Sequence, residues 1–153
     1  MTTHEKWKAI PGFEGFYEVS DQGQVRSLDR IDSRGCQRKG KLMSPVRGHR
    51  GHLQVSLSKN GKVEGMYVHR LVLLAFIGPC PEGMEACHWN DISDDNRLSN
   101  LRWDTPSANR RDALRNGRNY YANRTHCPSG HEYTPEMTWS ISFCALRQWI
   151  ISG

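Results

Sequence analysis

The fold is decided by one stretch of the sequence, residues 87–109, which reads CHWNDISDDNRLSNLRWDTPSAN. A strand near Met84–His88 leads into a polar loop, and Leu101-Arg102-Trp103 forms a second short strand. Thr105-Pro106 then favours the start of a helix, with the threonine as N-cap and the proline at the first helical position. The stretch therefore predicts strand, loop, strand and helix, which is a ββα unit.

The residues before this unit predict a hairpin followed by a buried helix. Apolar and polar residues alternate over residues 53–58, as in a half-buried strand. Asn60-Gly61 is a strong signal for a two-residue hairpin turn, and the return strand runs to about Val68. Residues 69–77 suit a short buried helix, which Gly78-Pro79 ends.

The first thirty residues are rich in aromatic side chains and are interrupted by glycine. Phe16–Val19 and Gln24–Leu28 predict two short strands, and Asp21-Gln22-Gly23 supplies the turn between them. Residues 29–50 follow as a basic loop with several glycine and proline breakers. This part of the chain therefore predicts a small antiparallel module ahead of the ββα unit.

The excess positive charge lies in this N-terminal part. The net charge is +5, and residues 1–60 hold 11 Lys/Arg against 6 Asp/Glu. The segment from Arg26 to Arg50 is either a solvated loop or a nucleic-acid contact. We favour the contact because glycine and polar residues interleave the charges. The candidates there for DNA contact are Arg26, Arg30, Arg34, Arg38, Lys39, Lys41, Arg47 and Arg50.

The stretch 87–109 resembles the HNH endonuclease family, and the likeness extends over residues 67–117. The resemblance implies an α+β fold with a ββα-metal (His-Me finger) unit around one divalent cation, Mg²⁺ or Mn²⁺. It implies a metal-dependent endonuclease that cuts double-stranded DNA. By position, His88 would be the general base, Asn100 would brace the hairpin, and Asn109 would give its side-chain oxygen to the metal.

The chemistry of phosphodiester hydrolysis agrees with these roles. The reaction needs a deprotonated water, and histidine accepts a proton at neutral pH because its unperturbed pKa is near 6.5. It also needs charge neutralisation at the phosphate and at the leaving oxygen, which a divalent cation supplies. His88 by itself would be read as a surface histidine, and its place in this pattern makes it the candidate base.

Cys87 departs from the family pattern, in which an aspartate that binds the metal often precedes the catalytic histidine. A thiolate is a poor ligand for Mg²⁺, which prefers oxygen. Three outcomes are open: Asn109 holds the ion with waters and the phosphate, Asp91 substitutes for the missing aspartate, or activity is weak.

The N-terminal residues Trp7–Leu28 resemble the NUMOD4 motif, which accompanies HNH domains in phage and intron-encoded homing endonucleases. That likeness implies a module that contributes DNA contacts. We expect a NUMOD4-like β module with a basic loop over residues 1–60 and the nuclease domain over 61–117. A C-terminal extension follows over 118–153.

The C-terminal extension resembles the start of a small Cys/His zinc element. Its possible zinc ligands are Cys127, His131 and Cys144, but Arg147 stands where a fourth ligand would fall. Either the three ligands hold zinc with water or His126, or the site has decayed.

Three further residues are candidates for DNA contact. His69 and Arg70 stand at the start of the predicted buried helix, where a helix N-terminus favours phosphate. A structural hydrogen bond is the alternative for both. Arg102 faces outward, either toward DNA or toward Asp104.

Composition places the chain among folded proteins, with 37% hydrophobic and 24% charged residues. No apolar run is long enough to span a bilayer, and the opening residues lack the layout of a secretory signal. We expect a cytoplasmic protein of a phage-infected bacterial host, as a monomer or weak dimer, with its cysteines free or bound to metal. The alternatives are a non-catalytic, sequence-specific DNA-binding protein on a decayed HNH scaffold and a zinc-stabilised interaction module.

Overall fold

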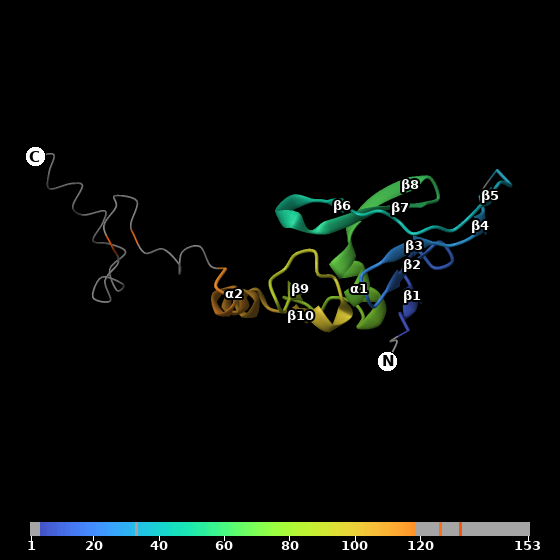
Figure 1. Cartoon of the computed structure of the whole chain (residues 1–153). Coiled ribbons are helices and arrows are strands. Elements are labelled where there is room, and N and C mark those ends of the chain that lie inside the picture. The colour runs from blue at the N-terminus through green and yellow to red at the C-terminus, as the bar shows by residue number, and fades with distance from the viewer. Residues whose placement is uncertain (1–3, 33, 119–125, 127–131, 133–153) are drawn as a thin grey trace, which may run out of the picture. The chain divides into compact units, whose positions relative to one another are not determined.

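The computed structural model describes residues 4–32 and 34–118, together with His126 and Glu132. The chain divides into two compact units, residues 1–113 and 114–153, and all the strands described below, with the candidate site residues from His52 to Asn109, lie in the first. Within the described residues the strands form four small antiparallel sheets (Figure 1). None of the helices in this part of the chain is long and apolar enough to cross a membrane.

The N-terminal sheet has the order β1-β2-β3, with β1 at Trp7–Ala9, β2 at Tyr17–Ser20 and β3 at Val25–Ser27. The two predicted strands are confirmed as β2 and β3. The sequence did not predict β1, because three residues with mostly exposed side chains carry no alternation of apolar and polar positions.

The predicted basic loop is wrong in part, because several of its residues pair as strands. β4 (Arg30–Ile31) pairs with β5 (Gln37–Arg38), and β6 (Val46–Arg47) joins the next sheet. The carboxylate of Asp32 holds the β4–β5 turn by accepting from the backbone N–H groups of Arg34 and Cys36 at 3.0 and 2.9 Å. Such pairing depends on backbone hydrogen bonds, so charged side chains hide it from sequence patterns.

The predicted hairpin is confirmed, with β7 at Leu53–Lys59 and β8 at Lys62–Tyr67. A short 3-10 helix, η1 (His49–Gly51), precedes it. Asn60 and Gly61 have φ angles of 53° and 78°, as the two-residue turn requires. The expected boundary after residue 60 therefore falls at a hairpin tip, and both flanking regions belong to the compact unit of residues 1–113.

Helix α1 (Val68–Phe76) confirms the predicted buried helix and lies at the centre of this unit. Val68, Leu71, Val72 and Leu73 are buried in one core with Ile10, Tyr17, Val19, Val25, Val55, Leu57 and Leu101. The core thus joins the N-terminal sheet, the β7–β8 hairpin and the ββα unit. Gly78 ends the helix with φ of 121°, and its N–H donates to the Leu73 carbonyl at 3.0 Å.

The predicted ββα unit is confirmed as β9 (Glu85–His88), β10 (Leu101–Asp104) and α2 (Pro106–Arg115), with a short 3-10 helix, η2 (Leu98–Asn100), before β10. The register pairs His88 with Leu101 and Cys87 with Arg102. Thr105 caps α2, because its hydroxyl accepts from the Ala108 N–H at 3.2 Å.

Candidate active site

The two faces of the β9–β10 hairpin separate the candidate residues. Successive residues of a strand point to opposite faces, so His88 and Cys87 diverge although they are neighbours in sequence. His88 lies on the face toward α1, where it meets His69 of that helix. Glu85 lies on the other face, where it meets Asn109 of α2. We refer to these as the histidine face and the α2 face.

Three histidines from separate elements meet on the histidine face. His52 precedes β7, His69 lies in α1, and His88 ends β9. Their ring centroids are 4.8 Å apart for His52 and His69, 5.6 Å for His52 and His88, and 5.2 Å for His69 and His88. Each offers one ring nitrogen, and these three atoms lie within 4.8 Å of one another. His69 and His88 are buried, with 6% of each residue exposed, and His52 is half-buried.

Burial keeps two of these rings neutral at pH 7. It lowers the pKa of His69 to about 3, and the charges that His88, His52 and Arg70 would carry act in the same direction. Burial also lowers the pKa of His88, against an opposing contribution from its contact with Asn96. That contact joins His88 Nε2 and Asn96 Oδ1 at 3.4 Å. A neutral His88 keeps one ring lone pair with which to accept a proton.

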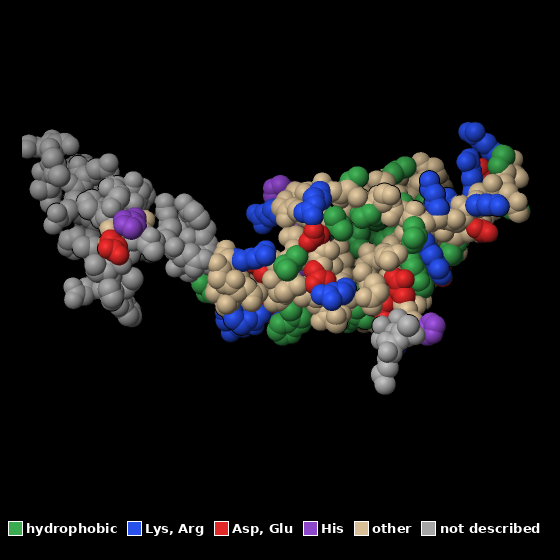
Figure 2. Space-filling model, in the orientation of Figure 1, with side chains coloured by type: hydrophobic (Ala, Val, Ile, Leu, Met, Phe, Trp, Pro, Cys, Tyr) green, Lys and Arg blue, Asp and Glu red, His purple; other side chains and the backbone are tan. Residues whose placement is uncertain are grey.

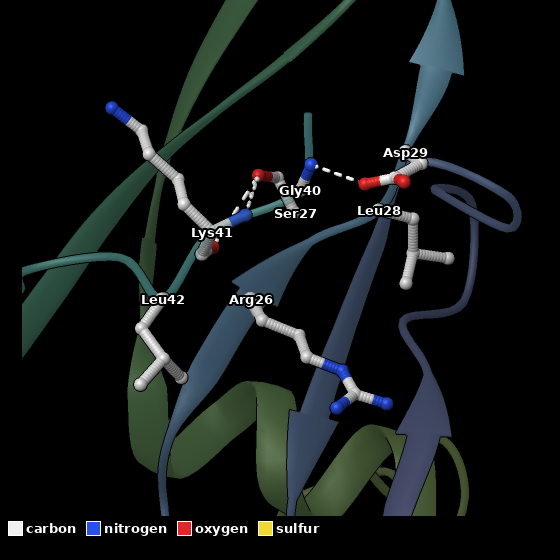
Figure 3. Close-up of a pocket in the computed structure, with 7 residues that line it drawn as sticks. All are labelled: Arg26, Ser27, Leu28, Asp29, Gly40, Lys41 and Leu42. Atoms are coloured by element: carbon white, nitrogen blue, oxygen red, sulfur yellow. Dashed lines mark hydrogen bonds between the residues drawn. The ribbon is translucent and has the colours of Figure 1, made fainter. Parts of the chain in front are cut away.

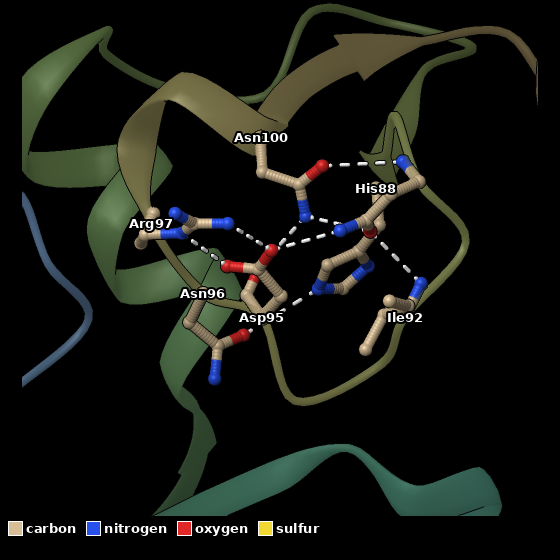
Figure 4. A network of polar contacts seen from close by, with 7 residues as sticks. His88, Ile92, Asp95, Asn96, Arg97 and Asn100 are labelled. Atoms are coloured by element: carbon tan, nitrogen blue, oxygen red, sulfur yellow. Dashed lines mark hydrogen bonds and ion pairs between the residues drawn. The ribbon is translucent and has the colours of Figure 1, made fainter.

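The side chain of Asn100 holds the loop that follows His88 (Figure 4). Its Oδ1 accepts from the backbone N–H of Asn90 at 3.1 Å. Its Nδ2 donates to Asn90 Oδ1 and to the Asp95 carbonyl, both at 2.9 Å. The Asn100 carbonyl also accepts from the Trp89 N–H at 2.9 Å. A buried amide that makes three side-chain hydrogen bonds fixes both ends of the loop.

Asp95 and Arg97 continue this network (Figure 4). Both carboxylate oxygens of Asp95 accept from Arg97, at 2.7 Å each, and Asp95 Oδ2 also accepts from Asn90 at 2.8 Å. The hydrogen bonds from Arg97 hold the pKa of Asp95 down, at about 2. Asp95 is therefore ionised at neutral pH and paired with Arg97.

The N-terminal sheet contacts the same loop through its predicted turn. The Leu98 N–H donates to the Asp21 carbonyl at 2.8 Å. Gly23, with φ of 82°, lies so close that an added Cβ would stand 2.7 Å from Asn96 Cβ and 2.9 Å from its carbonyl oxygen. Since Asn96 touches His88, the turn fixes a neighbour of the candidate base. Sequence reasoning missed Asn96, which only the fold brings to His88.

The α2 face presents oxygen ligands. Asn109 Nδ2 donates to Glu85 Oε1 at 2.8 Å, so the two side chains meet between β9 and α2. Cys87 is buried on the same face, and burial, with a further contribution from Glu85, raises the pKa of its thiol to about 11. A neutral thiol does not bind Mg²⁺, whereas carboxylate and amide oxygens do. Glu85 was absent from the sequence-based candidates, although strand alternation relative to Cys87 could have pointed to it.

Arg102 contacts acidic side chains, which was one of its two predicted roles. Its Nε donates to Asp104 at 2.8 Å, and a second nitrogen pairs with Asp112 of α2. Its guanidinium also lies 3.6 Å from the ring centroid of Trp89. With its side chain 15% exposed, Arg102 ties α2 to the hairpin.

The remaining basic candidates differ in how far they are engaged. Arg26 pairs with Glu18 at 2.6 Å and stacks on Trp7, Arg38 pairs with Asp32, and Arg47 pairs with Asp94 of the loop after His88. Arg30 lies 5.5 Å from the ring centroid of Phe16. Within the described part of the chain, no ion pair involves the other basic candidates, which are Arg34, Lys39, Lys41, Arg50 and Arg70.

Some of these basic side chains lie near β4 and β5, whereas Arg47 lies in β6, Arg50 in η1 and Arg70 in α1. Figure 2 shows Lys and Arg side chains gathered at the β4–β5 tip. Arg26 and Lys41 line a shallow pocket of about 560 Å³ with Ser27, Leu28, Asp29, Gly40 and Leu42 (Figure 3). Both observations suit contact with a polyanion.

Two candidates for metal binding remain, which are Asp91 and the possible zinc ligands of the C-terminal extension. Asp91 lies in the turn after β9 with φ of 57°, and its N–H donates to the His88 carbonyl at 3.2 Å. The possible zinc ligands Cys127, His131 and Cys144 lie outside the described residues.

Comparison with known proteins identifies both parts of the described chain. Residues 5–58 match the NUMOD4 motif, and residues 66–111 match the HNH endonuclease family. DNA endonuclease I-HmuI of Bacillus phage SP01 is 35% identical over 104 residues, covering 68% of this chain and 55% of that protein. The uncharacterized HNH endonuclease L247 of Acanthamoeba polyphaga mimivirus is 36% identical over 129 residues, covering 76% of this chain and 29% of that protein.

A solved structure that describes DNA binding and cleavage by the HNH homing endonuclease I-HmuI is similar to this chain. The TM-score is 0.62 and the sequence identity is 30%. The match covers 84% of this chain and 76% of that one. The chain thus spans about half the length of the curated I-HmuI relative and under a third of the mimivirus relative.

Proposed function

The chain belongs to the HNH homing endonuclease family and carries a NUMOD4 motif, and from this we infer that it is a DNA endonuclease. We propose that it hydrolyses one phosphodiester bond at a time with His88 as general base and one divalent cation, Mg²⁺ or Mn²⁺. The products would carry 5′-phosphate and 3′-hydroxyl ends.

The observation that carries this proposal is the environment of His88. The ring is buried at the end of β9, burial lowers its pKa, and the Asn100 network holds the loop that begins there. When Nε2–H donates to Asn96 Oδ1, Nδ1 retains the lone pair and accepts the proton of the attacking water. General base catalysis requires this combination of a neutral ring and a fixed orientation.

Asn109 and Glu85 are the residues that would hold the cation. The amide nitrogen of Asn109 donates to Glu85, which turns the amide oxygen into a ligand of fixed orientation. Glu85 adds carboxylate oxygen and so replaces the ligand that the neutral Cys87 thiol does not supply. A bound divalent cation offsets charge on the scissile phosphate and on the leaving oxygen.

The basic N-terminal module would bind the DNA backbone. The β4–β5 tip and Lys41 in the pocket present positive charge on the same compact unit as His88. If these groups neutralise several phosphates, the affinity for DNA falls steeply as salt rises.

Cleavage of supercoiled plasmid in Mg²⁺ or Mn²⁺ tests the proposal. We expect wild type to nick or linearise the plasmid and His88→Ala to lose activity by about 10²- to 10⁴-fold, the usual contribution of a general base. His49→Ala is the control, since His49 is an exposed histidine of the same unit, and it should cut like wild type. Equal cleavage by wild type and His88→Ala would overturn the assignment.

Cys87 favours one alternative, a DNA-binding protein without cleavage activity. The residue before His88 is a buried neutral thiol where the family often has a metal-binding aspartate. This alternative predicts salt-dependent binding to DNA and no cleavage with any divalent cation. The plasmid assay distinguishes the two functions.

A further inference from the structure

We propose that His52, His69 and His88 form a zinc site, separate from the oxygen ligands of Glu85 and Asn109. The two sets lie on opposite faces of the β9–β10 hairpin and take different cations. The binding part of this proposal stands without the proposed function, and only its consequence for cleavage rests on it.

The geometry of the three rings is close to that of a bound ion. Their candidate ligand atoms lie within 4.8 Å of one another. In a tetrahedral site with Zn–N bonds of about 2.0–2.1 Å, two imidazole nitrogens are about 3.4 Å apart. Binding of the ion therefore requires these atoms to approach one another, and His52 is the most exposed of the three residues.

Buried ring nitrogens without partners point to a ligand. His69 is 94% buried, being 6% exposed, and within the described residues its Nδ1 has no hydrogen-bond partner. The Nδ1 atom of His52 is also buried and lacks a partner in this part of the chain. Buried polar atoms are normally hydrogen-bonded, so two such nitrogens beside a third imidazole form a site that a cation completes.

The type of donor selects the metal. Imidazole nitrogen suits Zn²⁺, whereas Mg²⁺ and Mn²⁺ favour carboxylate, carbonyl and water oxygen. No carboxylate belongs to the three-histidine group. Three protein ligands also leave a fourth zinc position for water, on the side where His52 is half-buried.

Zinc at this site would occupy the nitrogen lone pair with which His88 accepts a proton. If His88 is the general base, zinc therefore inhibits the nuclease while Mg²⁺ or Mn²⁺ supports it. Zinc release would restore activity, so the site would make cleavage depend on free zinc.

Zinc titration of the chelator-stripped full chain by calorimetry tests the binding. We expect His52→Phe, which keeps a ring in the cluster, to weaken zinc binding more than about 100-fold, because even outer-shell changes cost 10- to 100-fold. His49→Phe, an exposed histidine three residues away, is the matched control and should bind zinc like wild type. Zinc binding by His52→Phe with wild-type affinity would overturn the proposal.

Further controls separate a loss of zinc binding at the three histidines from a loss of folding and from zinc binding elsewhere in the chain. His52→Gln provides a second substitution, and thermal unfolding without zinc checks that each variant folds. The titration is repeated in a Cys127→Ser background, because the C-terminal cysteines could bind zinc independently. The absorption spectrum of the Co²⁺-bound protein gives a second readout. A site made only of histidines has no thiolate-to-cobalt charge-transfer band. An intense band of this kind that disappears in His52→Phe would contradict the three-histidine site.

The plasmid assay then tests the consequence. Zn²⁺ added to Mg²⁺-supported reactions should suppress wild type and His49→Phe, and His52→Phe should resist at least tenfold more zinc. If zinc inhibited His49→Phe and His52→Phe equally, zinc bound at the three histidines would not be the inhibitor. Absence of cleavage by wild type in every cation would refute the proposed nuclease instead, and the titration would still decide the zinc site.

Discussion

On one face of the β9–β10 hairpin, His88 lies among imidazoles, whereas on the other face Glu85 contacts the amide of Asn109 and Cys87 is buried. The first face is rich in nitrogen, and buried rings on it are neutral at pH 7. The second face is rich in oxygen and is held by ion pairs of Arg102 with Asp104 and Asp112.

In the proposed mechanism one strand separates two functions, because His88 and Glu85 of β9 lie on opposite faces of the hairpin. A base must keep its lone pair, and a cation bound to the same nitrogen would remove it. Alternation along β9 places His88 on one face and Glu85, one of the two proposed oxygen ligands, on the other. In the proposed mechanism the base and the oxygen-bound cation therefore do not compete for one atom.

After His88→Ala, the next largest expected effect tests the α2 face. Glu85→Gln should lower cleavage at fixed Mg²⁺ by about 100-fold, because the amide that replaces the carboxylate removes negative charge beside Asn109. Higher Mg²⁺ or Mn²⁺ should restore part of the activity. Glu82→Gln, an exposed acid just before β9, is the control. An unchanged Mg²⁺ dependence of Glu85→Gln would remove Glu85 from the cation site.

The second prediction concerns the histidine face and the pH dependence of stability. The pKa of His69 is about 3 in the folded protein and near 6.5 when unfolded, so the unfolded chain binds more protons between these values. Stability should be complete above pH 6.5 and fall as pH drops below it, by at most about 1.4 kcal/mol per pH unit for this group.

Urea unfolding in chelator between pH 7.5 and 5 measures this dependence. His69→Asn should flatten the profile, and His49→Asn, which alters an exposed ring, should not. A slope that His69→Asn leaves unchanged would mean that other groups set the acid stability.

The smallest expected effect tests the contact between the N-terminal sheet and the loop after His88. Gly23→Ala adds a Cβ 2.7 Å from Asn96 Cβ at a φ of 82°, so the Asn96 loop, which contacts His88, must shift. Gly83→Ala is a matched control, because Gly83 has φ of 73° and no atom within 4 Å of the added Cβ.

Both substitutions should cost about 1 kcal/mol of stability from backbone strain. Only Gly23→Ala should also lower the rate of cleavage, by several-fold. Thermal unfolding and initial cleavage rates measure the two effects, and equal rates for the two variants would show that the contact does not position His88.

Most of the secondary structure near the site was predictable from local pattern. Alternation in β7, the Asn60-Gly61 turn and the Thr105 cap each depend on a few neighbouring residues, and the structure has all of them. β4, β5 and β6 were not predictable, because two-residue strands with exposed side chains are stabilised by backbone pairing and leave no hydrophobic pattern.

The candidate site likewise has a part that local sequence patterns identified and a part that only the tertiary structure brings together. The order of His88, Asn100 and Asn109 along the chain identified the ββα unit, since strand, turn and helix signals are local and this unit is short. The grouping of His52 and His69 with His88, the closeness of Gly23 to Asn96, and the pairing of Glu85 with Asn109 join residues that are 17 to 73 positions apart. Local alternation gives the face that a strand residue takes, but the partner it meets there is set by packing around α1 and α2, which no local pattern of residues encodes.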